Sequence, residues 1–260
     1  MRIVRFSFGD PASSSYAFGV IEGAPGAEQV AVIDGHPFGE LSLKEARVPL
    51  AGVRLLPPIL PSKVVAIGKN YADHAREMGG DPPPEPLLFL KPSTSIIGPG
   101  AAIVRPSLSA EVDYEGELAV VIGRLCREVP LERASEVILG YTCANDVTAR
   151  DLQRRDGQWS RAKGFDTFCP LGPWIETELD PSDLAIGTRV NGVVRQDART
   201  SLLLHDVFEL IVFISAAMTL LPGDVILTGT PAGVGPISAG DEVSVTIEGI
   251  GTLTNTVVAR

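Results

Sequence analysis

The chain has 260 residues, and its 45% of apolar and 21% of charged side chains exclude a protein that is disordered throughout. The formal net charge of −10 disfavours nucleic-acid binding, because an acidic surface repels phosphate backbones. Three cysteines without a CxxC pair, a start unlike a signal peptide and apolar runs too short for a bilayer predict a cytoplasmic protein that binds no membrane.

Residues 1–58 predict a small N-terminal strand-rich domain. Residues 2–8 alternate between apolar and polar side chains, and residues 16–23 predict a second strand. The proline-rich stretch 54–61 favours a boundary, so a second, larger domain is expected over residues 59–260. No set of residues in the first section indicates catalysis.

Residues 63–71 predict a buried strand, and residues 72–78 predict a short helix. Two glycines and three prolines within residues 79–84 then exclude regular structure. This composition is typical of a mobile lid, and equally of an ordinary surface loop.

His74 and Glu77 lie three residues apart on the predicted helix. Glu77 could orient His74 and raise its basicity, so that the pair takes a proton from water. Of the three histidines in the sequence, His74 alone has polar neighbours on a helix with hinge residues. A histidine without a catalytic role is the alternative that the residues leave open.

Residues 115–123 (EGELAVVIG) predict a strong strand. Residues two apart on a strand point to the same face, so Glu115 and Glu117 project together, and Asp113 has the same parity. Neighbouring carboxylates repel one another and lose hydration, and a hard divalent cation removes both costs. The pattern therefore predicts a metal site, with the solvated acidic face of an edge strand as the alternative.

Residues 132–146 predict a helix followed by a strand, with another helix after Asp146. Asp146 is either the N-cap of that helix or an acidic ligand. Arg150 and Gln153 would share a helix face with it and could order a metal and an anionic substrate together. Salt-bridged surface residues are the alternative. Lys163 has no local signature and is, on sequence grounds alone, a surface lysine.

The C-terminal part predicts two hairpins and a glycine-rich loop. Asn-Gly within residues 190–194 indicates a type I′ turn, and residues 202–220 predict the one long helix. Residues 224–236 (DVILTGTPAGVGP) predict a buried strand that leads into a loop around Thr230. Such a loop can offer N–H groups and a hydroxyl to an anion, although its spacing matches neither a P-loop nor a dinucleotide-binding fingerprint. The segment from residue 241 predicts the last hairpin.

Several stretches together resemble the fumarylacetoacetate hydrolase family. They are GKNYADHAREM, LFLKPST, YEGELAVVIG, NDVTARDLQ, the lysine in RAKGFDTF, and LLPGDVILTGTPAGVGP. They occur in the order of the family and cover residues 60–260 of this sequence. The resemblance implies an α+β, strand-rich fold, built as a roll of mixed β-sheets with few helices and a small N-terminal piece, and a homodimer.

The resemblance also implies a role for each residue singled out above. The residues that match the acidic triad for Mg²⁺ or Mn²⁺ are Glu115, Glu117 and Asp146. The residues that match catalytic positions are His74 and Glu77, which activate water, and Lys163, which stabilises an oxyanion or enolate. The residues that match substrate-binding positions are Arg150, Gln153 and Thr230. Some larger relatives use a fourth acidic ligand upstream; none is assigned in this sequence, so waters or substrate oxygens are expected to complete the metal shell.

The implied chemistry begins with a small anionic 2-oxo acid that chelates the metal. Cleavage of the adjacent carbon–carbon bond through a metal-stabilised enolate would be acylpyruvate-type hydrolysis or oxaloacetate-type decarboxylation. Isomerisation of intermediates such as 2-hydroxyhepta-2,4-diene-1,7-dioate, from aromatic catabolism, is the alternative. A non-catalytic, metal-bound binding module is a third interpretation, from another class of function.

Overall fold

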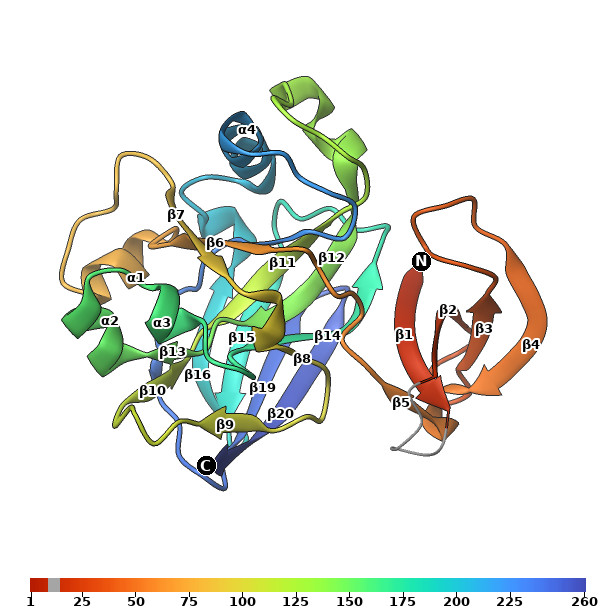
Figure 1. Ribbon diagram of the computed structural model, residues 1–260, viewed down its shortest axis with the longest axis horizontal. Helices are drawn as coiled ribbons and strands as arrows, with labels where there is room; N and C mark the ends of the chain where they lie inside the picture. Colours follow the sequence, from red (N-terminus) through yellow and green to blue (C-terminus); the bar gives the residue numbers. More distant parts are fainter. Residues whose placement is uncertain (9–14) are drawn as a thin grey trace.

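The computed structural model describes residues 1–8 and 15–260. Its largest unit is a mixed twelve-stranded sheet in the order β4-β3-β2-β1-β14-β12-β11-β17-β6-β7, with β5 paired to β1 and β8 paired to β14 (Figure 1). The strands of this sheet are β1 (Arg2–Phe8), β2 (Tyr16–Glu22), β3 (Gln29–Ile33), β4 (Leu43–Pro49), β5 (Val53–Leu55), β6 (Val64–Gly68), β7 (Leu87–Lys91), β8 (Ile96–Ile97), β11 (Gly116–Ile122), β12 (Ile138–Asn145), β14 (Cys169–Glu176) and β17 (Val225–Leu227).

Two smaller sheets complete the β-structure of the described residues. One runs in the order β16-β15-β19-β20-β9 and the other in the order β13-β10-β18. Their strands are β9 (Ile103–Arg105), β10 (Val112–Tyr114), β13 (Thr148–Ala149), β15 (Ala185–Val190), β16 (Val193–Arg199), β18 (Gly235–Pro236), β19 (Glu242–Ile247) and β20 (Gly251–Ala259). Both predicted hairpins are confirmed. The turn between β15 and β16 places Asn191 and Gly192 at φ 51° and 77°, as a type I′ turn requires.

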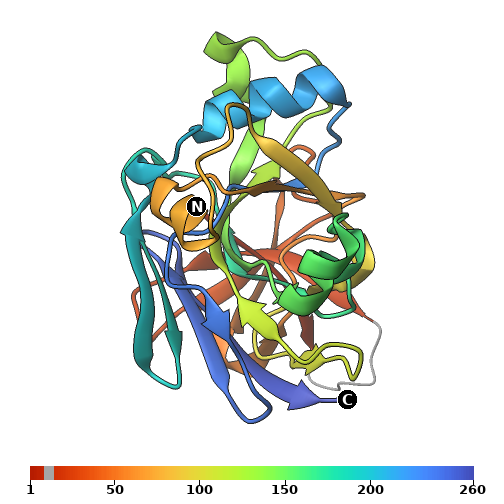
Figure 2. The ribbon, with the colours of Figure 1, turned by 90° about the vertical axis from the view of Figure 1, so that its left-hand side faces the viewer.

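The helices are few and short. The α-helices are α1 (Ala72–Glu77), α2 (Arg150–Asp156), α3 (Ser160–Lys163) and α4 (Val207–Ala217), and the 3₁₀ helices are η1 (Leu50–Gly52), η2 (Ser93–Ser95), η3 (Leu131–Val137) and η4 (Thr200–Leu202). Figure 2 shows α4 and η3 together at one end of the molecule, with the hairpins of the five-stranded sheet toward the other. The strand-rich α+β fold with mixed sheets and few helices is therefore confirmed.

Two predicted helices differ from the observed ones. The helix expected over residues 202–220 begins only at Val207, because a capping box fixes its N-terminus there. Asp206 Oδ1 accepts hydrogen bonds from Phe208 N (2.8 Å) and Glu209 N (2.9 Å), and Glu209 accepts one from Asp206 N. The helix expected from residue 132 is the 3₁₀ helix η3, which ends where β12 begins.

The core lies on both faces of β11. Leu118 and Val120 pack into a cluster with α4 and the five-stranded sheet, while Ala119 and Val121 pack into a second cluster that includes Ile3 of β1. Both faces are covered, which is why this strand reads as a continuous apolar run in the sequence.

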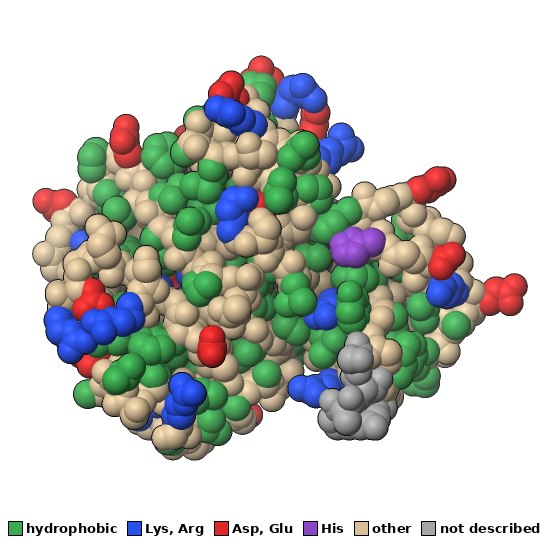
Figure 3. All heavy atoms as spheres, viewed as in Figure 1, with side chains coloured by type: hydrophobic (Ala, Val, Ile, Leu, Met, Phe, Trp, Pro, Cys, Tyr) green, Lys and Arg blue, Asp and Glu red, His purple; other side chains and the backbone are tan. Residues whose placement is uncertain are grey.

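The N-terminal strands form a lobe that shares this sheet with the rest of the chain. β1 pairs antiparallel with β14, with Ile3 opposite Ile175, and the N-terminal ammonium of Met1 donates to Glu176 at 2.6 Å. Figure 3 shows a notch between the lobe and the larger body. The lobe therefore joins the body through both backbone pairing and core packing.

Four chain segments meet at one edge of the main sheet. β17 runs parallel to β6, so the loops that follow these two strands leave from the same edge. β11 is antiparallel to both β17 and β12, so its start and the end of β12 lie at that edge as well. The edge thus gathers α1, the glycine-rich loop, Glu117 and Asp146.

None of the helices in the described part of the chain has the length and apolar character that crossing a bilayer requires.

Candidate active site

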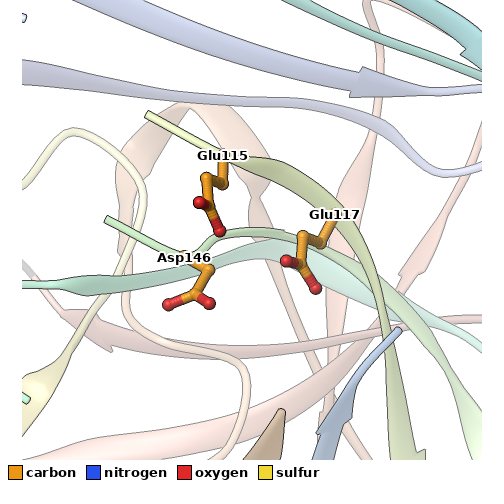
Figure 4. A group of neighbouring side chains, drawn as sticks. All are labelled: Glu115, Glu117 and Asp146. Carbon is orange, nitrogen blue, oxygen red and sulfur yellow. The ribbon is translucent and has the colours of Figure 1, made fainter. Parts of the chain in front are cut away.

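The three acidic residues of the predicted triad converge in one buried cluster. Each of Glu115, Glu117 and Asp146 offers a carboxylate oxygen, and these oxygens all lie within 4.8 Å of one another (Figure 4). The alternative of a solvated edge strand is wrong, because β11 lies between β12 and β17 and all three side chains are buried. Three convergent carboxylates are a donor set that fits a hard divalent cation.

The glycine between the two glutamates is required by packing. A β-carbon on Gly116 would lie 2.1 Å from Thr188 Oγ1 and 3.2 Å from Gln196 Oε1. Gly116 N donates to Gln196 Oε1 at 3.0 Å, and Glu115 N donates to Asn145 Oδ1 at 2.9 Å. These contacts fix the backbone from which both carboxylates project.

The two glutamates differ in electrostatic environment. Burial raises the pKa of Glu117 well above its ordinary value, and the carboxylates of Asp146 and Glu115 raise it further. Burial opposes ionisation of Glu115 too, but Arg150 and Lys163 outweigh it and lower its pKa. Glu117 is thus the member whose negative charge most lacks compensation from the protein, and a cation would supply it.

Asp146 is not a helix N-cap. α2 begins at Arg150, with Ala149 before it, and Asp146 lies between β12 and β13. Its carboxylate accepts hydrogen bonds from Lys91 Nζ at 2.5 Å and from Lys163 Nζ at 2.7 Å. Hydrogen bonds with two distant lysines, and not with the N–H groups of a helix, therefore fix the Asp146 carboxylate.

Lys163 is buried rather than a surface residue, with 3% of its side chain exposed. Its ammonium bridges Glu115 and Asp146, at 2.7 Å from each. Burial alone would lower the pKa of Lys163, but the two carboxylates reverse the shift and raise it. The ammonium therefore stays charged beside the triad.

Arg150 and Gln153 meet on α2, as their spacing predicted. Arg150 Nη1 donates to Gln153 Oε1 at 2.9 Å, Nε donates to Asp113 Oδ2 at 2.8 Å, and Nη2 donates to Glu115. Arg150 is buried, so the alternative of a surface salt bridge is wrong for it. Asp113 is the partner of this guanidinium and does not join the triad. Asp146 precedes the helix and does not share its face.

His74 and Glu77 lie on α1, where His74 Nδ1 is 3.2 Å from Glu77 Oε2. Glu77 also accepts a hydrogen bond from Gly233 N at 3.0 Å, which ties the helix to the glycine-rich loop. Burial lowers the pKa of His74, although Glu115 and Glu77 act in the opposite direction. The imidazole is therefore neutral near physiological pH. That α1 opens as a lid stays a prediction.

Thr230 is buried at the start of the glycine-rich loop. Its hydroxyl donates to Gly116 O at 2.9 Å and accepts from Gln196 Nε2 at 2.7 Å. The preceding Gly229 N donates to Glu117 Oε2 at 2.7 Å. The loop thus orients a triad carboxylate, and the hydrogen of the Thr230 hydroxyl is used within the protein.

A cavity of about 200 Å³ unites these groups. Every predicted site residue lines it except Glu77, which contacts His74. Residues that the sequence analysis did not single out also line it, among them Lys69, Arg154 and Trp159. Lys91 was missed as well. It stands in LFLKPST, one of the stretches of the family resemblance, but no local pattern indicates its burial.

The comparisons with known proteins agree with this architecture. A family model described as fumarylacetoacetate (FAA) hydrolase C-terminal matches residues 63–258, and a model described as Rv2993c-like, N-terminal matches residues 1–58. A solved 5-carboxymethyl-2-hydroxymuconate delta-isomerase from Mycobacterium smegmatis is 58% identical, with a TM-score of 0.93 over 100% of both chains.

Two further relatives are named for other reactions. The maleylpyruvate hydrolase from Sphingobium sp. SYK-6, solved in complex with manganese(II) ion and pyruvate, is 33% identical, with a TM-score of 0.80 over 100% of this chain and 99% of that chain. A mitochondrial oxaloacetate tautomerase of Rattus norvegicus is 42% identical over 85% of this chain and 77% of its own length. With the family model covering most of the sequence, the chain belongs to the fumarylacetoacetate hydrolase family.

Proposed function

We propose that the chain is a divalent-metal-dependent enzyme that cleaves a carbon–carbon bond in small 2-oxo or diketo carboxylates. The reaction would be acylpyruvate-type hydrolysis or oxaloacetate-type decarboxylation. The observation that carries the proposal is that the acidic triad and a buried, neutral His74 line the same cavity. This arrangement supports a cation and a base that would act together on one small substrate.

Glu115, Glu117 and Asp146 would hold Mg²⁺ or Mn²⁺. When bound, such an ion supplies a Lewis acid that polarises the 2-oxo group. The raised pKa of Glu117 supports this assignment, because the carboxylate lacks a protein cation of its own. The manganese ion in the maleylpyruvate hydrolase complex, a protein 33% identical to this chain, supports it independently.

His74 would take the proton from water in hydrolysis. The hydrogen bond from Nδ1 to Glu77 leaves Nε2 as the basic nitrogen. Glu77 is itself held by Gly233 N, so the ring has a fixed orientation. A neutral, oriented imidazole in a cavity is the form that general-base catalysis requires.

Lys163 and Arg150 would stabilise the negative charge that develops when the bond breaks. Both cations are buried, so their charges act with little screening by water. Gln153 fixes one guanidinium nitrogen and keeps its own amide N–H groups for the substrate. Thr230 would form part of the cavity wall against the substrate.

Isomerisation is the second candidate function. It would move only a proton next to the 2-oxo group and leave the carbon framework intact. The names of the 58% identical delta-isomerase and the 42% identical oxaloacetate tautomerase favour it. The same cation site and the same base would serve both reactions.

Turnover assays separate these reactions. Acetylpyruvate, oxaloacetate and a 2-hydroxydienoate are each incubated with the protein and Mg²⁺ or Mn²⁺. Replacing His74→Ala should reduce hydrolysis about a hundredfold or more while decarboxylation falls less. His205→Ala is the control, because His205 does not line this cavity. Equal losses in both reactions would contradict the role given to His74. No turnover together with unchanged melting on adding chelator would favour a non-catalytic binding module.

We also propose a cytoplasmic homodimer. The edge strand β7 supports self-association, because Leu87 and Leu90 are exposed on it. Light scattering coupled to size-exclusion chromatography measures the mass directly, and a monomer at micromolar concentration would contradict the proposal.

A further inference from the structure

Gln196 of β16 is a buried amide that does not line the cavity of the triad. The pairing of β15 with β16 shifts register just before it, so Arg195 is an extra, exposed residue in β16. Such a β-bulge changes the direction of the neighbouring side chains. A β-carbon on Gly233 would lie 2.1 Å from Arg195 O, so the glycine-rich loop packs directly against the bulge. Gln196 therefore lies where the five-stranded sheet meets that loop.

The Gln196 amide closes a ring of three hydrogen bonds around Gly116. Gly116 N donates to Gln196 Oε1 at 3.0 Å, Gln196 Nε2 donates to Thr230 Oγ1 at 2.7 Å, and Thr230 Oγ1 donates to Gly116 O at 2.9 Å. Gly116 stands between Glu115 and Glu117, so this hydrogen-bond ring fixes the peptide group on each side of it. The backbone that carries both glutamates is thus held by a residue of another sheet.

The same amide also holds the glycine-rich loop. Gln196 Nε2 donates its second hydrogen to Pro231 O at 2.7 Å. Two residues before Pro231, Gly229 N donates to Glu117 Oε2 at 2.7 Å. Gln196 is therefore connected to Glu117 in two ways, through the backbone of the strand and through the loop that binds the carboxylate.

Burial makes these hydrogen bonds difficult to replace. Gln196 is 1% exposed and Thr230 is 2% exposed, so water does not reach the groups that they pair. Without the amide, the N–H of Gly116 and the carbonyl of Pro231 would each lose a partner at a buried position, which is costly. The strand or the loop would then shift, and the triad carboxylates would shift with it.

We infer that Gln196 is a positioning residue of the acidic triad, which places Glu115 and Glu117 for a divalent cation through the hydrogen-bond ring. The inference rests on the proposed function, which assigns Mg²⁺ or Mn²⁺ to the triad. Replacing a group that orients metal ligands commonly weakens metal binding by about ten- to a hundredfold. A residue that only stabilises the fold would instead change the free energy of unfolding and leave the metal affinity intact.

The test measures binding of Mg²⁺ and Mn²⁺ by calorimetry without substrate, together with urea denaturation in chelator. Gln196→Met keeps the length of the side chain but lacks the amide, and it should bind both ions about tenfold or more weakly. Thr200→Val is the matched control. Thr200 follows β16 directly, is buried, and bonds Leu184 N and Pro181 O outside the cavity. It should lose stability in urea and keep the metal affinity of the wild type.

Thr230→Val opens the same hydrogen-bond ring at another member. Because the ring acts as one unit, the double variant Gln196→Met/Thr230→Val should bind metal about as weakly as the weaker single variant. Losses that multiply in the double variant would show that the two side chains act separately, and this result overturns the inference. If Gln196→Met does not fold, Thr230→Val decides, and wild-type metal affinity in it overturns the inference.

The remaining outcomes separate this inference from the proposed reaction. Wild-type metal affinity in folded Gln196→Met overturns the positioning role and leaves the proposed reaction in place. An equal loss of affinity in Thr200→Val overturns it too, because the loss would follow from stability alone. Metal binding that depends on Gln196, in a protein that turns over no 2-oxo acid, contradicts the proposed reaction and supports the positioning role. Absence of metal binding by the wild type overturns both.

Discussion

Lys91 donates a hydrogen bond to Oδ1 of Asp146 at 2.5 Å, and the side chains of both residues are buried. The same ammonium donates to the main-chain carbonyl of Lys163, whose own ammonium contacts Oδ2 of Asp146 at 2.7 Å. Two lysines thus fix both oxygens of one carboxylate. Lys91 also fixes the backbone that carries Lys163, so it positions two members of the site without lining the cavity.

Replacing Lys91→Met should weaken Mg²⁺ or Mn²⁺ binding about tenfold or more, because the carboxylate of Asp146 loses its fixed orientation. Titration calorimetry of the metal alone measures this effect. Lys44→Met, at an exposed position outside the cavity, is the control. Retention of full metal affinity in a folded Lys91→Met protein would show that Lys163 alone is enough to orient Asp146.

Replacing Glu117→Gln should have opposite effects with and without metal. Metal affinity should fall about tenfold or more, since one charged ligand is lost. The metal-free protein should melt at a higher temperature than the wild type, because Glu117 is buried beside two other carboxylates and its pKa is raised. Metal titration and thermal melting in chelator measure the two effects. The control is Glu111→Gln, on the exposed pair with Arg154. A lower melting temperature for metal-free Glu117→Gln would contradict the electrostatic account.

Replacing Glu77→Gln should move the acid limb of the pH–rate profile to lower pH. Glu77 raises the pKa of His74 through its hydrogen bond and its charge, against the lowering by burial. Without that charge the pKa falls further below the ordinary 6.5, and the imidazole stays neutral to lower pH. The kcat/KM profile for acetylpyruvate measures the shift. Asp73→Asn, exposed on the same helix, should leave the limb in place. A shift to higher pH would exclude His74 as the group that titrates.

Replacing Asp224→Asn should destabilise the fold in a pH-dependent way. The buried carboxylate accepts hydrogen bonds from Ser62 Oγ (2.6 Å), Leu221 N (2.8 Å) and Lys63. Burial would raise its pKa, but these partners outweigh burial and lower it below 3.8. Its stabilisation is therefore present above the ordinary pKa and lost as the pH falls through the folded value.

Urea denaturation tests this prediction for Asp224. The free energy of unfolding of Asp224→Asn should be about 2 kcal/mol lower near neutral pH. The deficit should shrink as the pH falls below 3.8, because the wild-type carboxylate loses its stabilising charge when it protonates. A deficit of constant size over this range would mean that the charge of Asp224 does not contribute.

The parts of the site that the sequence could predict are those set by local geometry. The spacing of Glu115 and Glu117 places both on one side of a strand, and the spacing of Arg150 and Gln153 places both on one side of a helix. Both predictions depend on backbone periodicity alone, and in the structure Glu115 lies beside Glu117 and Arg150 contacts Gln153. The start of α4 could also have been predicted, because Asp206-x-x-Glu209 is a capping-box pattern.

The burial of Lys163 and Lys91 could not be predicted from local pattern. A lysine becomes a core residue only when carboxylates from distant segments surround its ammonium, and Asp146 comes from a different element than either lysine. For Asp146 the local pattern was misleading, because its place before a predicted helix indicated an N-cap, whereas its carboxylate binds the two lysines. Here only the resemblance to a family pointed to the observed arrangement.

The parallel pairing of β17 with β6 has a consequence for biosynthesis. Val225 lies opposite Val64, so this pairing closes a loop of most of the chain length. Contacts so distant in sequence form late, because closing the long loop between them costs chain entropy before the contacts stabilise the fold. A ribosome would have to release nearly the whole polypeptide before the glycine-rich loop could reach the strand that carries Glu117. The nascent protein is therefore inactive until its last strands emerge.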